Sequence, residues 1–354
     1  MKNTQKFLII FVLILISTFG NFSTVLALNI DDTNLPSGHL YQCYKYSKPV
    51  PHFFTHQIIN DPKKAFNSRL SHHYDKDCIT HTEFENFLTE MYNNNYCLVD
   101  IYDVVGYDHG KPYFKELFVP LGKKPFLLSF DDMSYDTMGL GLSDKIILDE
   151  NGNIASFTES NNPQVEYDKE AICLLESFIK AHPDFSHNGA RAIICPTGYN
   201  GILGYRINKE SRIDRQKQIE EIKPLIKKLK ELNYHFASHT FNHIQVAYSS
   251  DRDLYLDLKK YQDEIISIIG KTDILSFPCG ASVSKGSKLD ILKSFGYNIF
   301  FLVGDGKNIE KNEAVFLKRE VLNGVALRNY RKEYMEYFDT KKVYDKDRTI
   351  PFPN

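Results

Sequence analysis

The sequence predicts an α/β fold in which parallel strands alternate with crossover helices. Short apolar runs recur along the chain between longer segments whose apolar residues are spaced three or four apart. Several of the apolar runs end directly in acidic, histidine or Pro/Gly motifs. This alternation is typical of a parallel sheet covered by helices, with its functional loops at one edge.

Individual segments carry clear signals for each type of element. Thr80 and Glu83 form a capping box, and Phe84, Phe87 and Met91 then mark a helix with one buried face. Further helices are expected from residue 168, over 219–229 with a kink or a new start at Pro224, over 251–269 and over 289–295. Strands are expected at 97–101, 125–130, 191–195, 234–237, 274–277 and 298–303.

Residues 134–165 interrupt this alternation. They are rich in Gly, Asn, Asp and Ser and contain the turn sequence Asp149-Glu150-Asn151-Gly152-Asn153. We interpret the segment as an insertion that forms a hairpin or a lid. Clustered glycines at 198–204 predict another loop above the same end of the sheet.

Composition limits the classes of function. The chain has 354 residues, of which 42% are hydrophobic, enough for one large domain or two small ones with a sizeable core. Its 43 basic and 45 acidic residues are balanced, which argues against nucleic acid as a partner. Six scattered cysteines leave both disulfides and buried thiols open.

The N-terminus predicts export from the cytoplasm. Lys2 and Lys6 precede the apolar run 7–16, and residues 25–27 (Val-Leu-Ala) offer a cleavage site, as in a secretory signal peptide. An uncleaved anchor over residues 7–28 is the alternative, since that length just spans a bilayer. We therefore expect a signal peptide or membrane anchor at 1–28, a linker at 29–50 and a folded domain at 51–345, secreted or tethered at the cell surface.

The first chemical feature is the acid pair Asp131-Asp132, which directly follows the strand expected at 125–130. Parallel α/β folds place their sites at the carboxyl ends of the strands, so this position favours a functional role. Adjacent acids alone mean little, since Asp31 and Asp32 form a pair without such a setting.

The second feature is the pair His239 and His243, which follows the strand expected at 234–237. Histidines four apart lie on one face of a helical turn, where two imidazoles can bind one metal ion. The spacing is not specific by itself, because His52 and His56 share it.

Together, the acid pair and the two histidines predict a catalytic metal site. Two histidines and one carboxylate are a common catalytic metal set, with positions left for water and substrate. One acid of the pair would bind the metal, and its neighbour would serve as general base. A third motif, Phe277-Pro278-Cys279-Gly280, is a turn after another expected strand and is weak by itself.

Three motifs occur in the order found in one known family. SFDD at 129–132, SHTFNH at 238–243 and FPCG at 277–280 resemble those of polysaccharide deacetylases with a NodB homology domain, carbohydrate esterase family 4. The segment VPHFFTHQII at 50–59, followed by a helix and a strand, is also similar. The resemblance covers roughly residues 50–320.

The resemblance implies a distorted (β/α) barrel with an insertion after the first motif. It implies a divalent metal, often zinc, held by Asp132, His239 and His243, with Asp131 as general base. The reaction would hydrolyse the acetamide of an N-acetylated glycan, with Pro278 and Gly280 next to the substrate.

Two departures from the family pattern bear on activity. Met133 replaces a usual glycine after the acid pair, where its side chain would narrow the substrate groove. The late Leu-x-His motif that supplies the general acid has no counterpart, because no histidine follows His243. Asp305, Arg319 and Arg328 are possible helpers that the pattern does not assign.

Three functions therefore stand as hypotheses. The first is an extracytoplasmic metal-dependent deacetylase of a cell-wall or extracellular polysaccharide. The second is a weak or inactive relative that binds envelope glycan without turnover, as the missing acid histidine would allow. The third is a metal-dependent amidase or esterase with another substrate, such as acetylated xylan.

Overall fold

The computed structural model describes residues 42–135, 140–160, 162–211, 214–304 and 306–353. The expected signal peptide or anchor at 1–28 lies outside these residues, as does the linker up to residue 41. The described end of that linker forms strand β1 (Cys43–Tyr46), which pairs with β6 (Leu117–Pro120). Among the described residues, no helix combines the length and the apolar character that a membrane crossing requires.

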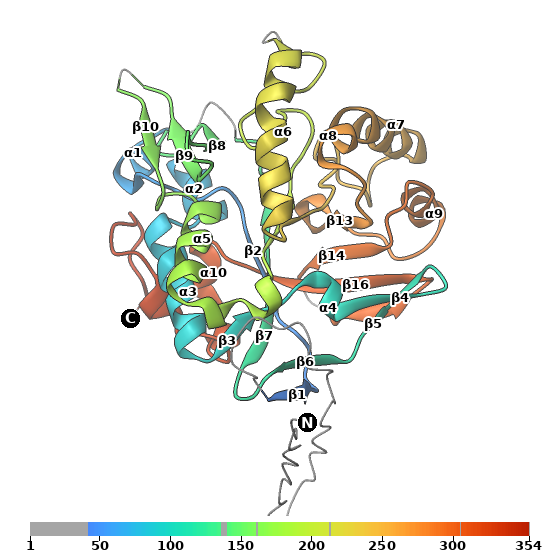
Figure 1. Ribbon diagram of the computed structural model, residues 1–354, viewed down its shortest axis with the longest axis horizontal. Coiled ribbons are helices and arrows are strands. Elements are labelled where there is room, and N and C mark those ends of the chain that lie inside the picture. Colours follow the sequence, from blue (N-terminus) through green and yellow to red (C-terminus); the bar gives the residue numbers. More distant parts are fainter. Residues whose placement is uncertain (1–41, 136–139, 161, 212–213, 305, 354) are drawn as a thin grey trace, which may run out of the picture.

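Parallel strands form a nearly closed barrel at the centre of the molecule (Figure 1). Neighbouring strands pair in parallel and follow one another around the barrel in chain order. A single parallel bridge between Ser238 and Leu275 joins the two ends of the row. The expected α/β fold and its distorted barrel are thus confirmed. The barrel strands are β2 (His52–Thr55), β7 (Lys124–Asp131), β11 (Ile193–Cys195), β12 (His235–Phe236), β13 (Ile274–Ser276), β14 (Ile299–Val303) and β16 (Ala314–Val321).

Helices cover the outside of the barrel, with α3, α5 and α10 on one side and α7, α8 and α9 on the other (Figure 1). The helix expected over 251–269 is one continuous rod that contains a π-helical turn, Gln262–Ile266. Pro224 lies inside α6, which the structure shows as a single helix. The helices are α1 (Pro62–Phe66), α2 (Ser71–Asp77), α3 (His81–Asn93), α4 (Ile101–Val104), α5 (Ala171–Ala181), α6 (Arg215–Glu231), α7 (Asp251–Tyr261), α8 (Ser267–Ile269), α9 (Ser287–Ser294), α10 (Gly324–Asn329), α11 (Arg331–Tyr334) and α12 (Thr340–Val343).

Helix α3 begins at the capping box that the sequence indicated. The Thr80 hydroxyl accepts a hydrogen bond from the Glu83 amide, and the Glu83 carboxylate accepts one from the Thr80 amide. The two reciprocal bonds satisfy amides that a helix start leaves without partners. Phe84, Phe87 and Met91 are fully buried, so the predicted apolar face packs against the barrel.

The insertion after the first motif forms an antiparallel meander, β8 (Lys145–Leu148), β9 (Ile154–Thr158) and β10 (Gln164–Glu166). Residues 136–139, at its start, lie outside the described part of the chain. Three further features of the sheets were not expected from the sequence. They are the hairpin of β4 (Val105–Asp108) and β5 (Lys111–Phe114), the pairing of β3 (Tyr96–Leu98) with β7, and the pairing of β15 (Ile309–Lys311) with β16.

Alternation along the strands decides which side chains enter the barrel, because successive side chains point to opposite faces of a sheet. On β7, Phe126, Leu128 and Phe130 belong to the core beneath the outer helices, whereas Leu127 belongs to the core inside the barrel. By the same parity, Asp131 faces the barrel interior at the end of the strand. Asp132 is the first residue beyond the strand and lies at the rim.

Candidate metal centre

The three predicted metal ligands meet at the carboxyl-terminal edge of the barrel. Asp132 follows β7, and His239 and His243 follow β12. One ligand atom from each residue can be chosen so that all three lie within 4.8 Å of one another. Oδ1 of Asp132 is 3.6 Å from Nε2 of His239 and 3.5 Å from Nε2 of His243. We call these three residues the metal centre.

His239 is held in the tautomer that a metal ligand needs. Its Nδ1 lies 2.9 Å from the carbonyl oxygen of Ser276, a contact in which only the nitrogen can donate. The lone pair is therefore on Nε2, the atom that faces Asp132. Burial lowers the pKa of His239 and outweighs the nearby carboxylates, so the ring is neutral at neutral pH.

The loop of the two histidines is fastened by a carboxylate from α7. Asp257 accepts hydrogen bonds from the amides of Phe241 (2.7 Å) and Asn242 (2.8 Å). The loop that these bonds hold has a strained backbone, since His243 has a φ of 53°. The backbone of Asp132, across the metal centre, is also strained, with a φ of 55°. Non-glycine residues adopt the left-handed region rarely, and such strain is concentrated at functional sites.

The donor set fits a divalent cation. Oδ1 of Asp132 is buried and has no hydrogen-bond partner among the described residues, although the rest of its side chain is partly exposed. A buried carboxylate oxygen that faces the lone pair of His239 Nε2 and has no hydrogen-bond donor is favourable only with a positive charge beside it. Two imidazoles and one carboxylate suit zinc at a catalytic site, where further positions stay open.

The structure adds His56, which the sequence analysis treated only as an example of unspecific spacing. Nε2 of His56 lies 3.9 Å from Oδ2 of Asp132, and its Nδ1 lies 2.9 Å from the carbonyl oxygen of Asp77. That carbonyl can only accept, so Nδ1 carries a proton and Nε2 faces the metal centre. The available signal was position, because His56 directly follows the end of β2 at the same edge of the barrel.

Asp131 lies buried beneath Asp132 in an ion pair with Arg319. The two guanidinium nitrogens of Arg319 donate to Oδ1 (2.8 Å) and Oδ2 (2.7 Å), and the Ser276 hydroxyl donates to Oδ2 at 3.2 Å. Burial by itself raises the pKa of the Asp131 carboxyl, but the charge of Arg319 outweighs it. The net pKa is therefore well below its ordinary value.

Arg319 belongs to a polar network that fills the top of the barrel. Its guanidinium donates to the Ser129 hydroxyl at 3.1 Å and lies 4.0 Å from the centre of the Phe54 ring. The Ser129 hydroxyl is also 2.9 Å from Nε2 of His52. Alternation on β16 brings Arg319 inward together with Val315 and Leu317, which is the signal that identifies it in retrospect.

The remaining predicted site residues have different outcomes. Met133 is fully buried in the main core, where its carbonyl oxygen accepts a hydrogen bond from the Leu203 amide. Its side chain therefore does not narrow a groove, contrary to our expectation, because the chain turns inward directly after Asp132. Pro278 is buried and Gly280 partly exposed in the turn after β13, and their contact with substrate stays a prediction.

The two other helpers named from the sequence do not act at this centre. Arg328 pairs with Asp75 and the Tyr344 hydroxyl, on the side of the molecule formed by α2 and α10. Asp305 lies outside the described residues. Cys78, Cys97, Cys173 and Cys195 are buried free thiols, and Cys279 is an exposed one.

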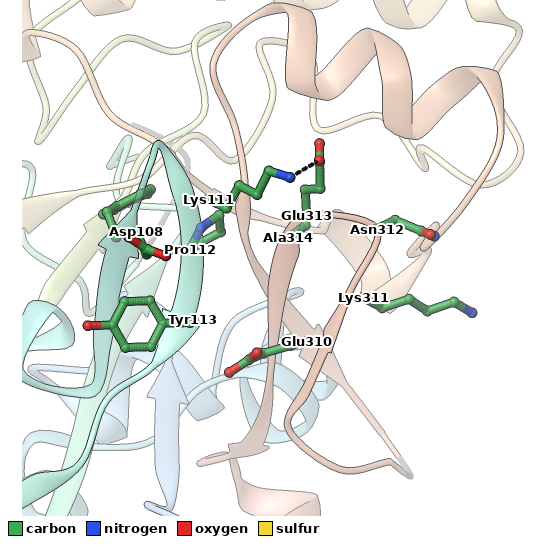
Figure 2. A pocket seen from close by; sticks show the side chains of 10 residues that line it. Asp108, Lys111, Pro112, Tyr113, Glu310, Lys311, Asn312, Glu313 and Ala314 are labelled. Atoms are coloured by element: carbon green, nitrogen blue, oxygen red, sulfur yellow. Dashed lines mark ion pairs between the residues drawn. The ribbon is translucent and has the colours of Figure 1, made fainter.

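A shallow cavity of about 690 Å³ lies elsewhere, between the β4–β5 hairpin and the β15–β16 hairpin (Figure 2). An ion pair between Lys111 and Glu313 crosses it. Ala314 lines this cavity and begins β16, so the cavity opens at the amino-terminal edge of the barrel. It is therefore on the opposite end from the metal centre and is not its substrate pocket.

These features define a (β/α)-barrel protein with an aspartate and two histidines arranged for one metal ion. A family model described as polysaccharide deacetylase matches residues 207–300, which include both histidines and the FPCG turn. Over these residues the match confirms the resemblance to polysaccharide deacetylases that the second and third motifs indicated, and the SFDD motif at 129–132 lies outside the match. At the level of that family, the match supports removal of acyl groups from polysaccharides. No curated protein sequence is significantly similar to this chain.

Several solved structures are similar to this chain at low sequence identity. The Streptococcus pyogenes deacetylase PplD, in complex with acetate, is 15% identical with a TM-score of 0.47, over 82% of this chain and 98% of PplD. A de-N-acetylase from Aggregatibacter actinomycetemcomitans is 17% identical with a TM-score of 0.43, over 78% and 95% of the two chains. IcaB from Ammonifex degensii is 12% identical with a TM-score of 0.43, over 79% and 94%.

Proposed function

We propose that this protein is an extracytoplasmic, metal-dependent hydrolase that removes N-acetyl groups from a cell-wall or extracellular polysaccharide. The observation that carries the proposal is the convergence of Asp132, His239 and His243, with an unpartnered Asp132 carboxylate oxygen between the two imidazoles. The lysines and apolar run at residues 2–16 support the location outside the cytoplasm.

Zinc is the metal that this donor set favours. When bound, the ion would lower the pKa of a water molecule and polarise the carbonyl of the acetyl group. The protein contributes by fixing the ligands in advance. The hydrogen bond from His239 to the Ser276 carbonyl and the hold of Asp257 on the histidine loop keep the imidazoles in place before the ion arrives.

Two side chains can move the protons of amide hydrolysis. Asp131 accepts a proton from the attacking water as the oxygen–carbon bond forms, and Arg319 keeps this carboxylate ionised and oriented. His56 in its imidazolium form, protonated on both nitrogens and with Nε2 toward the centre, donates the Nε2 proton to the leaving nitrogen as the carbon–nitrogen bond breaks. The products are acetate and a free amino sugar.

His56 also bears on the second hypothesis, an inactive glycan-binding protein. That hypothesis was motivated by the missing late histidine of the family pattern. An imidazole from the first barrel strand stands within 3.9 Å of Asp132 and can serve the same chemistry. We therefore give the hydrolase hypothesis priority.

The test combines metal content with acetate release. Purified protein is expected to bind about one zinc ion per chain and to release acetate from N-acetylglucosamine oligomers or peptidoglycan fragments. Asp132→Ala is expected to lose the zinc and the acetate release while staying folded by circular dichroism. Asp61→Ala, at the exposed start of α1, is the matched control and is expected to keep both.

Three outcomes would contradict the proposal. Full zinc content in Asp132→Ala would show that the ligand assignment is wrong. Zinc binding without acetate release from any acetylated glycan would favour the binding protein, and release from acetylated xylan alone would favour the esterase.

A further inference from the structure

The orientation of His56 depends on one backbone carbonyl. Its Nδ1 lies 2.9 Å from the carbonyl oxygen of Asp77, at the end of α2, while its Nε2 lies 3.9 Å from Oδ2 of Asp132. The acceptor that binds one nitrogen of an imidazole sets the direction of the other nitrogen. Whatever fixes the carbonyl of Asp77 therefore also directs His56 toward the metal centre.

The carbonyl of Asp77 belongs to the last turn of a short helix. Helix α2 has seven residues, and the final carbonyl groups of a helix have no partner within the helix. The Cys78 amide, in the same peptide unit, donates to the carbonyl oxygen of Tyr74 at 3.0 Å. Because a peptide unit is planar and trans, the Asp77 carbonyl points the opposite way, out of the helix end, where His56 meets it.

A buried arginine binds the carbonyl groups on both sides of Asp77. Nη1 of Arg348 donates to the carbonyl oxygen of Asp75 at 3.4 Å and to its Oδ1 at 3.0 Å. Nη2 of Arg348 donates to the carbonyl oxygen of Cys78 at 2.7 Å. The guanidinium is a rigid plane with donors in fixed directions, so one group holds both ends of the segment that presents Asp77.

Arg348 is itself anchored to helix α3. Its Nε and Nη2 donate to the two carboxylate oxygens of Glu83 at 2.6 and 2.7 Å, so each of the five guanidinium N–H groups has an acceptor. The Asp345 amide donates to Glu83 at 3.0 Å, and the Thr80 hydroxyl donates to Asp345 at 2.8 Å. The segment after α12 thus ties the end of α2 to a helix that packs against the barrel.

We propose that Arg348 is a positioning residue for His56 and acts through the last turn of α2. This inference rests on the proposed function, in which His56 delivers a proton to the leaving nitrogen. Arg348 binds the backbone that presents the Asp77 carbonyl, and this carbonyl aims the imidazole. The proposal assigns a role in the reaction to a residue that lies 292 positions after His56 in the chain.

A second buried arginine provides the matched control. Arg328 also pairs with the Asp75 carboxylate, and it donates to the Tyr344 hydroxyl at 2.8 Å. Among the described residues, its hydrogen bonds go to side chains and to no carbonyl group of α2. Arg328→Lys therefore disturbs the same ion pair and leaves the backbone around Asp77 held by Arg348.

The first measurement does not require activity. Long-range ¹H–¹⁵N NMR spectra of the full chain, labelled at the histidine nitrogens and supplied with zinc, show which nitrogen of a neutral imidazole carries the proton. At a pH of about 9, where an ordinary histidine is neutral, native His56 is expected to carry it on Nδ1. The His56 signals are identified by their loss in His56→Gln.

Arg348→Lys keeps the charge beside Glu83 but loses the planar fork that binds two carbonyls. It is expected to shift His56 to a mixture with the proton on Nε2, whereas Arg328→Lys is expected to keep the native form. Gly324→Ala is a second variant that changes no charge. Its Cβ would lie 2.2 Å from Nη1 of Arg348 and 2.4 Å from the carbonyl oxygen of Asp75, so the same shift is expected.

The second measurement is acetate release. Arg348→Lys is expected to lower kcat about tenfold with KM and zinc content unchanged, because a misdirected proton donor affects the chemical step. In the His56→Gln background, Arg348→Lys is expected to lower kcat by less than about twofold, since the donor that it positions is already absent. Arg328→Lys is expected to keep the native kcat within about twofold. A general loss of structure would lower kcat equally in both backgrounds.

The outcomes separate this inference from the proposed function. A native His56 without a proton on Nδ1, or a native proton position in both Arg348→Lys and Gly324→Ala, overturns the positioning role even if acetate is released. An equal loss of kcat in the native and His56→Gln backgrounds also overturns it. A shift in Arg348→Lys and Gly324→Ala that Arg328→Lys does not share supports the role. If the native protein then releases no acetate, the proposed function alone is refuted.

Discussion

Removing the charge of Arg319 is expected to destabilise the fold by about 3–5 kcal/mol, the range for breaking a buried ion pair by deleting one partner. Arg319→Met keeps most of the apolar stem but leaves the Asp131 carboxylate buried without its counter-charge. The hydrogen bonds in the structure give an independent measure of the free energy that this pair contributes to folding. Two hydrogen bonds to a charged group, at 2.8 and 2.7 Å, contribute about 1.5–3 kcal/mol each.

Urea denaturation at pH 7, followed by circular dichroism, measures this loss. Asp131→Asn in the Arg319→Met background removes the unpaired carboxylate and is expected to restore about 1–3 kcal/mol. The low pKa of Asp131 means that the pair stabilises the protein above the ordinary aspartate pKa. This contribution is lost as the pH falls through the pKa of the folded state. The deficit of Arg319→Met is therefore expected to shrink toward acid pH.

An exposed ion pair serves as the control for this experiment. Lys227 and Glu231 on α6 are 3.7 Å apart with side chains 79% and 58% exposed, and Lys227→Met is expected to cost less than about 0.5 kcal/mol. A loss below about 1 kcal/mol for Arg319→Met, or no restoration by Asp131→Asn, would refute the assignment of a charged, desolvated pair.

Three further predictions test other parts of the structure. His56→Gln is expected to lower kcat for acetate release by about 10²–10⁴ with zinc content unchanged, so a loss of zinc would make His56 a ligand instead. Burial raises the pKa of Glu170 from 4.5 to about 8, so its contribution to stability is full below pH 4.5 and is lost as the pH rises to about 8. Glu170→Gln is therefore expected to gain stability relative to the native protein over that range, by at most about 5 kcal/mol in thermal or urea melts, and equal pH profiles would contradict it. Thr80→Ala is expected to cost about 1–2 kcal/mol through the lost cap of α3, whereas Thr89→Ala on the exposed face of the same helix is expected to stay within about 0.5 kcal/mol.

Local sequence patterns predicted the elements whose signals are local. The capping box at Thr80, the helix of 251–269 and the buried strand at 125–130 appear where expected, because caps and apolar spacing act over a few residues. The strand at 314–321 was missed, although its alternating pattern brings Arg319 inward. The charged residues 318–320 weaken the apolar pattern by which a buried strand is recognised. Arg319 is nevertheless buried, because the polar network with Asp131 satisfies its charge.

The candidate site likewise contains residues that the sequence predicted and residues that it missed. Asp132, His239 and His243 were assembled from strand ends, since parallel strands bring their carboxyl ends to one edge. His56 was set aside because the spacing from His52 is not specific, and only the pairing of β2 with β7 brings it to Asp132. Met133 was expected at the groove, but its direction depends on how the chain packs after Asp132, and it turned into the core.

The sequence by itself determined the alternation of strands and helices, the strand ends that carry acids and histidines, and thus the residues that form the metal centre. Only the tertiary structure decided the partners of these residues, Arg319 for Asp131 and His56 for Asp132. The physical reason is the distance along the chain over which each kind of interaction acts. Backbone propensity and apolar spacing act between near neighbours in the chain, whereas ion pairs join residues that closure of the barrel brings together, as it does residues 131 and 319.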